Sequence, residues 1–180
     1  VSTNIQGMIN MIDAAELNNV KRLIFTSSDK AVNPTNVMGT TKLMGERLIT
    51  AANVHRRGEG GTIYASTRFG NVLGSRGSVI PIFKNQIMNS SPVTLTDENM
   101  TRFVMTVKEA VSLVLKSVFI AKGGEVFVTK MPVIKISDLA EVMIQVLSNK
   151  LKTNPKEIKI EKVGSKPGEK MYEELMNEEE

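Results

Sequence analysis

Residues 22–42 read RLIFTSSDKAVNPTNVMGTTK, and the fold class follows from this stretch. Its apolar start, 22–27, is bounded by polar residues and predicts a buried parallel strand. Pro34 and the asparagine before it force the backbone to turn, and the apolar spacing from 38 to about 52 predicts a helix. Asp29 and Lys30 therefore come where a strand ends, and ligands of open α/β sheets bind at that edge.

The rest of the chain continues this alternation of strands and helices without internal repeats. The first residues carry an apolar stripe at helical spacing, with Thr3 or Asn4 as the cap. Another helix is expected to begin at Ser137, and an amphipathic helix is expected after Gly168. The other expected elements are strands at 62–69, 93–95, 125–129 and 156–163 and helices at 78–88 and 107–121. This pattern predicts an α/β protein.

The composition excludes several kinds of catalytic site. No cysteine is present, which excludes disulfides and thiolate metal sites. The single histidine, His55, cannot build a serine-histidine triad or a histidine-rich metal site, so we expect no metal. His55 lies at the expected end of a helix, where favourable interaction with the helix dipole explains it.

Motifs follow one another along nearly the whole chain. They are SSDK at 27–30, MGTTK at 38–42, RFGNVLG at 68–74, MTRF at 100–103 and KPGEK at 166–170. In this order they resemble the extended short-chain dehydrogenases. Within these they resemble the CapD-like nucleotide-sugar 4,6-dehydratases of polysaccharide biosynthesis, of the UDP-N-acetylglucosamine type. The resemblance implies a lyase that binds a UDP-sugar and holds NAD or NADP tightly while recycling it.

The same resemblance implies the architecture. It implies the second half of a Rossmann-like parallel sheet with a smaller C-terminal substrate-binding α/β region. Residues 1–75 would be the remainder of the NAD-binding domain, and 76–180 the nucleotide-sugar region, interleaved with it. A dinucleotide fold opens with a strand and a glycine-rich turn, whereas this chain opens with a helix, so we expect a fragment that lacks about 100 residues. The full-length form is expected to be a homo-oligomer.

The formal net charge of +4 does not indicate a nucleic-acid partner. The positive residues are scattered and aromatic residues make up only 4% of the chain, so neither a basic stripe nor a stacking surface is predicted. A modest excess of lysine and arginine suits an anionic nucleotide-sugar instead. The sequence shows no bilayer-spanning run or signal-peptide pattern, so we expect a cytoplasmic location, although membrane segments upstream of this chain are not excluded.

The resemblance implies the catalytic roles. Asp29 is the general acid for the departing hydroxyl, Lys30 the base at C5 of the sugar, and Ser28 a hydrogen-bond partner of the C4 oxygen and the cofactor. Lys42 resembles the lysine that binds the nicotinamide ribose. Adjacent residues on a regular strand point to opposite faces, so Asp29 and Lys30 can both face the sugar only if the backbone leaves strand geometry there.

Met38 departs from most of the superfamily, which has a tyrosine base four residues before the lysine. A thioether has no titratable proton, so Met38 cannot act as that base. The same replacement is a feature of one branch of the polysaccharide-type dehydratases. The C4 proton must then leave through Ser28, Asp29 or water, and the sequence does not choose among them.

The substrate-binding residues are also implied by the resemblance. Asn71 would reach the diphosphate oxygens, and Arg102 would clamp the diphosphate with its forked guanidinium. Glu169 would accept hydrogen bonds from nucleotide hydroxyls, and Thr94 is a weaker candidate. A competing interpretation makes the glycines of 70–77 a phosphate cradle with Asp97 as the ribose-binding acid, but so loose a glycine pattern is weak evidence.

Three functions therefore remain open. The first is a UDP-N-acetylhexosamine 4,6-dehydratase. The second is a nucleotide-sugar epimerase or reductase of the same superfamily, whose product keeps its C6 hydroxyl. The third is a non-catalytic, truncated remnant that binds nucleotide-sugars.

Overall fold

A computed structural model describes residues 1–55 and 60–180. The chain folds into two compact units. The first unit comprises Val1–Gly70, Val107–Lys130 and Glu174–Glu180, and the second comprises Asn71–Thr106 and Met131–Glu173. The chain thus passes from one unit to the other more than once. None of the described helices is long and apolar enough to cross a lipid bilayer.

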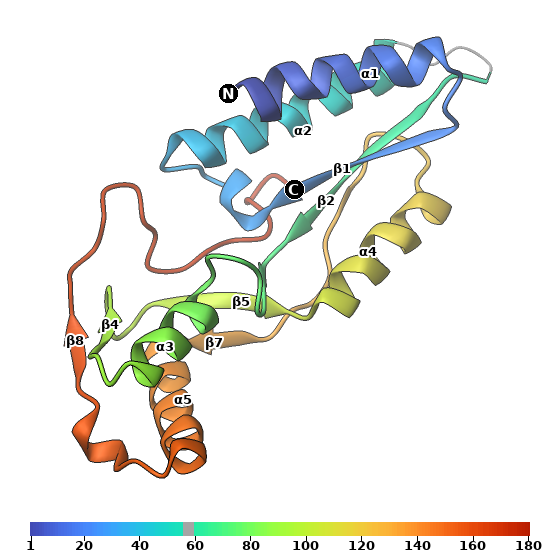
Figure 1. Cartoon of the computed structure of the whole chain (residues 1–180). Coiled ribbons are helices and arrows are strands. Elements are labelled where there is room, and N and C mark those ends of the chain that lie inside the picture. Colours follow the sequence, from blue (N-terminus) through green and yellow to red (C-terminus); the bar gives the residue numbers. More distant parts are fainter. Residues whose placement is uncertain (56–59) are drawn as a thin grey trace. The chain divides into compact units, whose positions relative to one another are not determined.

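The first unit is built on a parallel sheet with strand order β1-β2-β6. Strands β1 (Arg22–Ser28) and β2 (Ile63–Phe69) pair along their whole length, and β6 (Val126–Phe127) pairs with the middle of β2. Helices α1 (Gly7–Leu17) and α2 (Val37–His55) lie on one face and α4 (Val107–Ile120) on the other (Figure 1). The predicted α/β class and buried parallel strand are confirmed.

The core of this unit lies between the sheet and helices α1 and α2. It contains Ile12, Phe25, Ile49, Ala52 and Tyr64. Tyr64 is fully buried, and its hydroxyl donates to Glu16 Oε1 at 3.1 Å, so its one polar atom is satisfied at the α1 side. Gly45 of α2 lies against the Phe25 ring: a Cβ there would come within 2.5 Å of Phe25 Cζ. The helix can therefore approach the sheet only because position 45 has no side chain.

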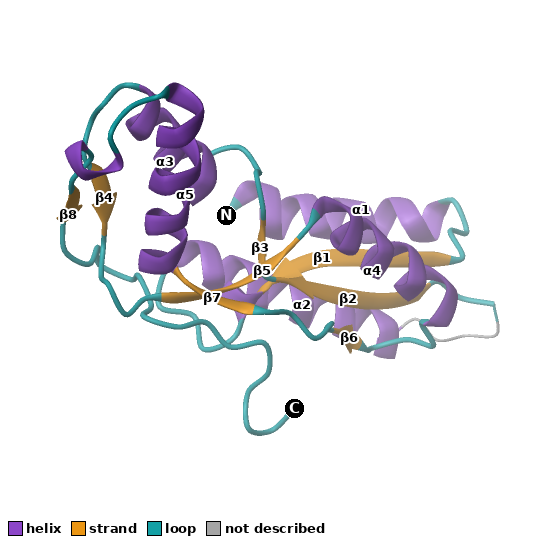
Figure 2. Cartoon of the chain, turned by 90° about the horizontal axis from the view of Figure 1, so that it is seen from below, coloured by secondary structure: helices purple, strands orange, loops and turns teal. Residues whose placement is uncertain are grey.

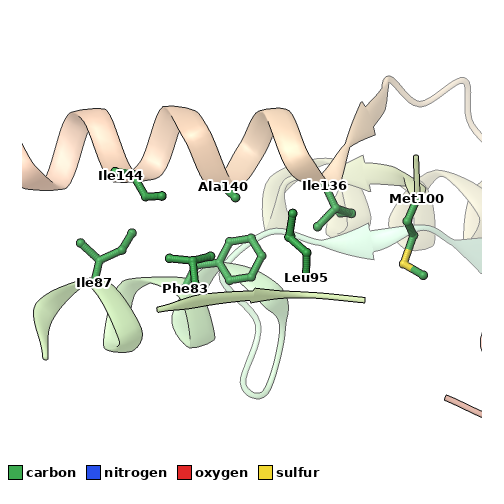
Figure 3. Packing of buried hydrophobic residues seen from close by; sticks show 8 residues of the cluster. Phe83, Ile87, Leu95, Met100, Ile136, Ala140 and Ile144 are labelled. Carbon is green, nitrogen blue, oxygen red and sulfur yellow. The ribbon is translucent and has the colours of Figure 1, made fainter. Parts of the chain in front are cut away.

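The second unit has a sheet of order β3-β5-β7, in which β3 (Asn71–Val72) is parallel to β5 (Thr101–Met105) and β7 (Val133–Lys135) is antiparallel to it (Figure 2). A separate parallel pair joins β4 (Val93–Leu95) to β8 (Ile160–Lys162). Helices α3 (Val79–Met88) and α5 (Ile136–Leu151) pack together, with Phe83 and Ile87 facing Ile136, Ala140 and Ile144 (Figure 3). This contact supplies the core of the unit.

The cap predicted at Thr3 or Asn4 is wrong, and the helix expected from Ser137 begins one residue earlier. The chain begins with one π-helical turn, Ser2–Gln6, without a side-chain cap, and the Asn4 amide donates to Thr41 Oγ1 at 3.0 Å instead. Helix α5 begins at Ile136 with Lys135 as its N-cap, and the Ser137 hydroxyl donates to the backbone oxygen of Glu98. In both places the side chain forms a hydrogen bond to a residue far away in the sequence, so it is not available to cap the helix.

Other expectations need correction in extent. The strands expected at 125–129 and 156–163 shrink to β6 and β8, and Pro155–Glu157 forms a turn of 3-10 helix. No helix forms after Gly168; residues 169–180 are turns and irregular backbone. The glycine-containing stretch at 70–77 includes β3 and leads into α3, which packs on α5 and β4. Asp97 accepts a hydrogen bond from the Asn99 N–H at 2.7 Å, so it closes a local turn.

Gly45→Ala is expected to destabilise the first unit by about 1–3 kcal/mol, because the new methyl group overpacks the buried Phe25 ring. Urea denaturation of the two proteins measures the change. Gly7→Ala is the matched control, since a Cβ at this helical position meets only the Ser2 carbonyl oxygen at 3.6 Å. Equal stability of Gly45→Ala and the wild-type chain would contradict the packing argument.

Candidate functional site

The backbone leaves strand geometry at the end of β1. Ser28 is still extended, with φ −150° and ψ 167°, and Asp29–Ala31 then form one turn of 3-10 helix. The Ser28 side chain accepts a hydrogen bond from the Lys30 N–H at 3.2 Å and so caps this turn. The Lys30 ammonium donates to Asp29 Oδ1 at 2.9 Å. Two neighbouring residues that a strand would separate therefore meet side chain to side chain.

The two members of this pair are buried to different degrees. Asp29 is fully buried, while the side chain of Lys30 is 30% exposed. The second carboxylate oxygen, Asp29 Oδ2, is buried and has no hydrogen-bond partner. Burying such an oxygen without a donor costs about 1–3 kcal/mol. The pair therefore leaves one carboxylate oxygen unused beside a partly accessible amine.

Helix α2 packs against this turn at Gly39. A Cβ at position 39 would collide with the Lys30 carbonyl oxygen and come within 3.1 Å of the Pro34 side chain. The Gly39 N–H donates to Asn36 Oδ1 at 2.9 Å, so this backbone N–H in the first turn of α2 has its acceptor in the preceding loop. The first turn of the helix thus packs directly on the backbone that carries the acid and the amine.

Lys42 reaches the same strand end from the next turn of α2. Its ammonium donates to the Thr26 carbonyl oxygen at 2.9 Å and lies 5.1 Å from the centre of the Phe25 ring. Burial lowers the pKa of Lys42, and the nearby Glu46 carboxylate partly offsets this effect. Met38, four residues earlier, is 45% exposed. The structure thus places Ser28, Asp29, Lys30 and Lys42 around the end of β1.

A buried ion pair, which we did not single out in the sequence, lies beside this group. Arg68 of β2 donates from Nε and Nη2 to the two oxygens of Glu46, at 2.9 and 2.8 Å, and their side chains are 2% and 4% exposed. Burial by itself would lower the pKa of Arg68, but hydrogen bonds to Glu46 and Glu180 raise it above its ordinary value. An arginine inside an otherwise buried strand was the only signal in the sequence.

The predicted substrate residues lie in the second unit. Asn71 and Arg102 line a small cavity of about 20 Å³. Arg102 donates from Nη1 to the Thr101 and Met171 carbonyl oxygens, at 2.7 and 3.3 Å. Its Nη2 lies 3.8 Å from Glu169 Oε1. Arg102 therefore shares the cavity with Asn71 and has Glu169, which does not line that cavity, as a loose ionic partner.

Thr94 does not line this cavity. Its hydroxyl accepts from Gln86 Nε2 at 2.8 Å and its N–H donates to Gln86 Oε1 at 3.3 Å, so Gln86 already binds both groups. Ser78, which was not predicted, does line the cavity, and its Oγ is buried without a hydrogen-bond partner. Its place as the N-cap of α3 was the sequence signal for it.

The family model described as "Polysaccharide biosynthesis protein" matches residues 1–180. An uncharacterized membrane protein of Methanocaldococcus jannaschii is 52% identical over the whole chain, which covers 54% of it. The UDP-N-acetylglucosamine 4,6-dehydratase (inverting) of Campylobacter jejuni is 41% identical over 96% of the chain and 48% of its own length. UDP-glucose 4-epimerase of Rickettsia felis is 39% identical over the whole chain and 50% of its length. The chain thus spans about half the length of these relatives.

Solved structures show the same fold. The X-ray structure of Pen from Bacillus thuringiensis is 52% identical, with a TM-score of 0.92 over 98% of this chain and 53% of that one. dTDP-glucose 4,6-dehydratase from Bacillus anthracis, solved with NAD, has a TM-score of 0.75 at 16% identity over 92% of this chain and 57% of that one. The second likeness concerns the fold alone.

Arg68→Met is expected to lower the free energy of unfolding by about 3–5 kcal/mol, because it leaves the buried Glu46 carboxylate without its counter-charge. Urea denaturation measures the loss, with Arg22→Met on the exposed start of β1 as the control. Replacing both charges, by Glu46→Leu with Arg68→Met, is expected to recover most of the loss. If Arg68→Met is as stable as Arg22→Met, the buried Arg68–Glu46 ion pair is contradicted.

At acid pH the protein should lose part of its unfolding free energy because Glu180 becomes protonated. The pKa of Glu180 is lowered from its ordinary 4.5, chiefly by hydrogen bonds from Arg68 and against an opposing effect of burial, with Asn177 and Arg47 contributing less. The folded state therefore holds this proton more weakly than the unfolded state does. The contribution of the Glu180 carboxylate to the unfolding free energy is full above pH 4.5 and disappears as the pH falls through the lowered pKa.

Urea denaturation at several pH values tests this effect. The difference in unfolding free energy between the wild-type chain and Glu180→Gln should be present at about pH 7 and shrink towards about pH 3. Glu179→Gln, in the same exposed stretch, should show no such trend. A difference that is independent of pH would argue against the Arg68–Glu180 contact.

Proposed function

Since the chain belongs to the polysaccharide biosynthesis protein family, we propose that it forms the catalytic part of a nucleotide-sugar 4,6-dehydratase. The proposed substrate is UDP-N-acetylglucosamine or a similar UDP-hexosamine. The observation that carries the proposal is the contact of 2.9 Å between Lys30 and Asp29, with Asp29 Oδ2 buried and unpartnered. Expelling water from a sugar needs one base and one acid close together, and this contact supplies both.

When bound, NAD or NADP would supply the acceptor for hydride from C4 of the sugar and return that hydride to C6. Lys30, as the free amine, takes the proton from C5, which the C4 ketone has made acidic. Asp29, as the free acid, gives its proton to the C6 hydroxyl, which leaves as water. One proton is gained by the amine and one is lost by the acid, so the step ends in the ammonium–carboxylate pair.

The return of hydride to C6 resets the amine, because C5 then needs a proton and the Lys30 ammonium gives it back. The proton released by the C4 hydroxyl restores the Asp29 acid. Over one turnover the sugar loses one water, and both groups return to their starting states. The 2.9 Å contact keeps the amine and the acid at the same two carbons of the sugar throughout.

Two residues fit the nicotinamide-ribose end of a dinucleotide. The Lys42 ammonium uses one N–H for the Thr26 carbonyl, and an ammonium has two more donors that can reach ribose hydroxyls. Its lowered pKa is consistent with a partly desolvated site for such a ligand. Ser28 would provide a hydroxyl at the same strand end. With the thioether of Met38 inert, Ser28, Asp29 or water removes the C4 proton.

The second unit would hold the nucleotide-diphosphate. Arg102 and Asn71 would contact the phosphate oxygens, and the unpartnered Ser78 hydroxyl lies in the same cavity and could donate to them. Glu169 would accept hydrogen bonds from nucleotide hydroxyls. Glu169 lies 3.8 Å from Arg102, a separation typical of a loose ion pair that an anionic ligand can displace. Thr94 remains the weakest of the proposed substrate contacts, since Gln86 occupies it.

A second candidate function is epimerisation at C4. The Rickettsia felis relative, named UDP-glucose 4-epimerase, favours it. Epimerisation needs no acid at C6, however, so it would leave the Asp29–Lys30 pair without a role. The dehydratase accounts for both groups, and we prefer it for that reason.

Lys30→Ala is expected to reduce formation of the 4-keto sugar by at least about 100-fold, because the base at C5 is lost. The assay uses the longest form of the protein that its gene encodes, with UDP-N-acetylglucosamine as substrate and nuclear magnetic resonance to identify the product. Lys21→Ala, an exposed lysine just before β1, is the matched control.

Retained turnover by Lys30→Ala would refute the assignment of the base. A wild-type product that keeps its C6 hydroxyl would instead establish the epimerase. Calorimetry of the chain with NAD addresses the third possibility, a non-catalytic remnant. Tight binding by this chain alone would count against it.

A further inference from the structure

The last residues of the chain, Glu174–Glu180, return to the first unit, and we call them the strap. We propose that the strap is a positioning element of the catalytic pair, which holds the turn carrying Asp29 and Lys30 through Asn33 and closes the Arg68–Glu46 cluster behind it. This inference rests on the proposed function for its catalytic consequence. It rests on contacts within the first unit for its geometry.

The first contact of the strap is with the catalytic loop itself. Asn33 Nδ2 donates to Glu174 Oε2 at 3.0 Å. Asn33 follows Lys30 by three residues and has φ +43°, in the left-handed region. This conformation costs a residue other than glycine about 1–2 kcal/mol, although asparagine tolerates it better than most. A side-chain partner at Asn33 therefore stabilises a loop conformation that the backbone does not favour by itself.

The second contact is with the buried arginine. A guanidinium has five N–H donors, and Arg68 uses Nε and Nη2 on Glu46. The strap provides the acceptors on the remaining side: Arg68 Nη1 donates to the Leu175 carbonyl oxygen at 2.9 Å, and Nη1 and Nη2 donate to the Glu180 carboxylate at 2.5 and 2.7 Å. Because Arg68 is 2% exposed, these acceptors replace water that the buried group has lost.

The strap has a defined shape of its own. The N–H groups of Glu179 and Glu180 both donate to Asn177 Oδ1 at 3.0 Å, and the Asn177 N–H donates to Glu180 Oε2 at 3.1 Å. This turn directs the Glu180 carboxylate to Arg68. The segment is therefore ordered by its own side chains and not only by the surface it covers.

These contacts lead directly to the catalytic groups. Arg68 pairs with Ser27 in the β1–β2 ladder, two residues before Asp29. Glu46 lies one helical turn after Lys42 on α2, and its carboxylate acts on the pKa of that lysine. The strap thus touches the loop after the pair, and through Arg68 and Glu46 it supports the strand before the pair and the helix that carries Lys42. Misplacing a catalytic group by about 1 Å can reduce a rate about 100-fold.

Amide hydrogen exchange tests the geometry without any assay of activity. The Lys30 and Val32 N–H groups donate to Ser28 Oγ and to the Asp29 carbonyl oxygen, so their exchange reports opening of the catalytic turn. In Glu174→Ala we expect these two amides to exchange about 10-fold faster while the amides of β2 stay unchanged. Glu178→Ala removes another glutamate side chain of the strap, one that is exposed, and should leave both rates unaltered.

Exchanging the donor and the acceptor of the Asn33–Glu174 hydrogen bond tests whether the slow amide exchange can be restored. Asn33→Asp alone places two carboxylates against each other and should accelerate exchange as Glu174→Ala does. Combining Asn33→Asp with Glu174→Gln restores one donor and one acceptor with reversed polarity, and it should return both amides to within about twofold of the wild-type rate. Unchanged exchange in Glu174→Ala, or no rescue in the double variant, overturns the proposal.

Turnover separates a positioning role from a merely structural one. For the UDP-sugar, we expect Glu174→Ala to lower kcat about 10-fold with KM within about twofold, since no phosphate contact is altered. The double variant should restore kcat. Faster exchange with an unchanged kcat would show that the strap stabilises the loop without positioning the catalytic pair. If the wild-type protein does not turn over the UDP-sugar, the proposed function fails, while hydrogen exchange still decides whether the strap holds the turn.

Discussion

The site depends on one break in backbone regularity, at the end of β1. A strand alternates its side chains between two faces, so an acid and an amine next to each other would be kept apart. The turn of 3-10 helix at Asp29–Ala31 removes this alternation and brings Lys30 Nζ to 2.9 Å from Asp29 Oδ1. The close packing of Gly39 under the Lys30 carbonyl, where a Cβ would collide, holds the turn in place. The catalytic role proposed for this pair therefore depends on where the strand stops.

The buried Arg68–Glu46 pair gives this region a second, electrostatic constraint. Moving two charges out of water is expensive, and their attraction compensates only if the remaining donors are also satisfied. Here Glu46 accepts two hydrogen bonds, and the backbone of Leu175 and the carboxylate of Glu180 take up the others. One arginine thereby joins a strand, a helix and the last residues of the chain. Such a cluster adds little to stability compared with an apolar core, but it specifies which elements meet.

In the second unit the buried charge, Arg102, has only a loose ionic partner. Arg102 is anchored by two backbone carbonyl oxygens, which leaves Glu169 as a distant partner at 3.8 Å. An anionic ligand can bind such an arginine without breaking a strong ion pair. The unpartnered Ser78 hydroxyl adds a donor in the same small cavity. Thr94 illustrates the opposite case, a polar residue whose neighbour has already satisfied it.

Local sequence patterns were enough to predict the α/β class, the long elements β1, β2, α2, α3 and α4, and the position of Ser28, Asp29, Lys30 and Lys42 at a strand end. These depend on apolar periodicity and on proline and glycine positions, which act over a few neighbouring residues. Tertiary contacts set the partners of Asn4, Ser137 and Arg68, the short strands β3, β5 and β7, and the irregular backbone after Gly168. Each of these depends on groups far away in the chain: a strand of two or three residues exists only through its ladder partner, and a buried charge is stable only where distant residues satisfy it.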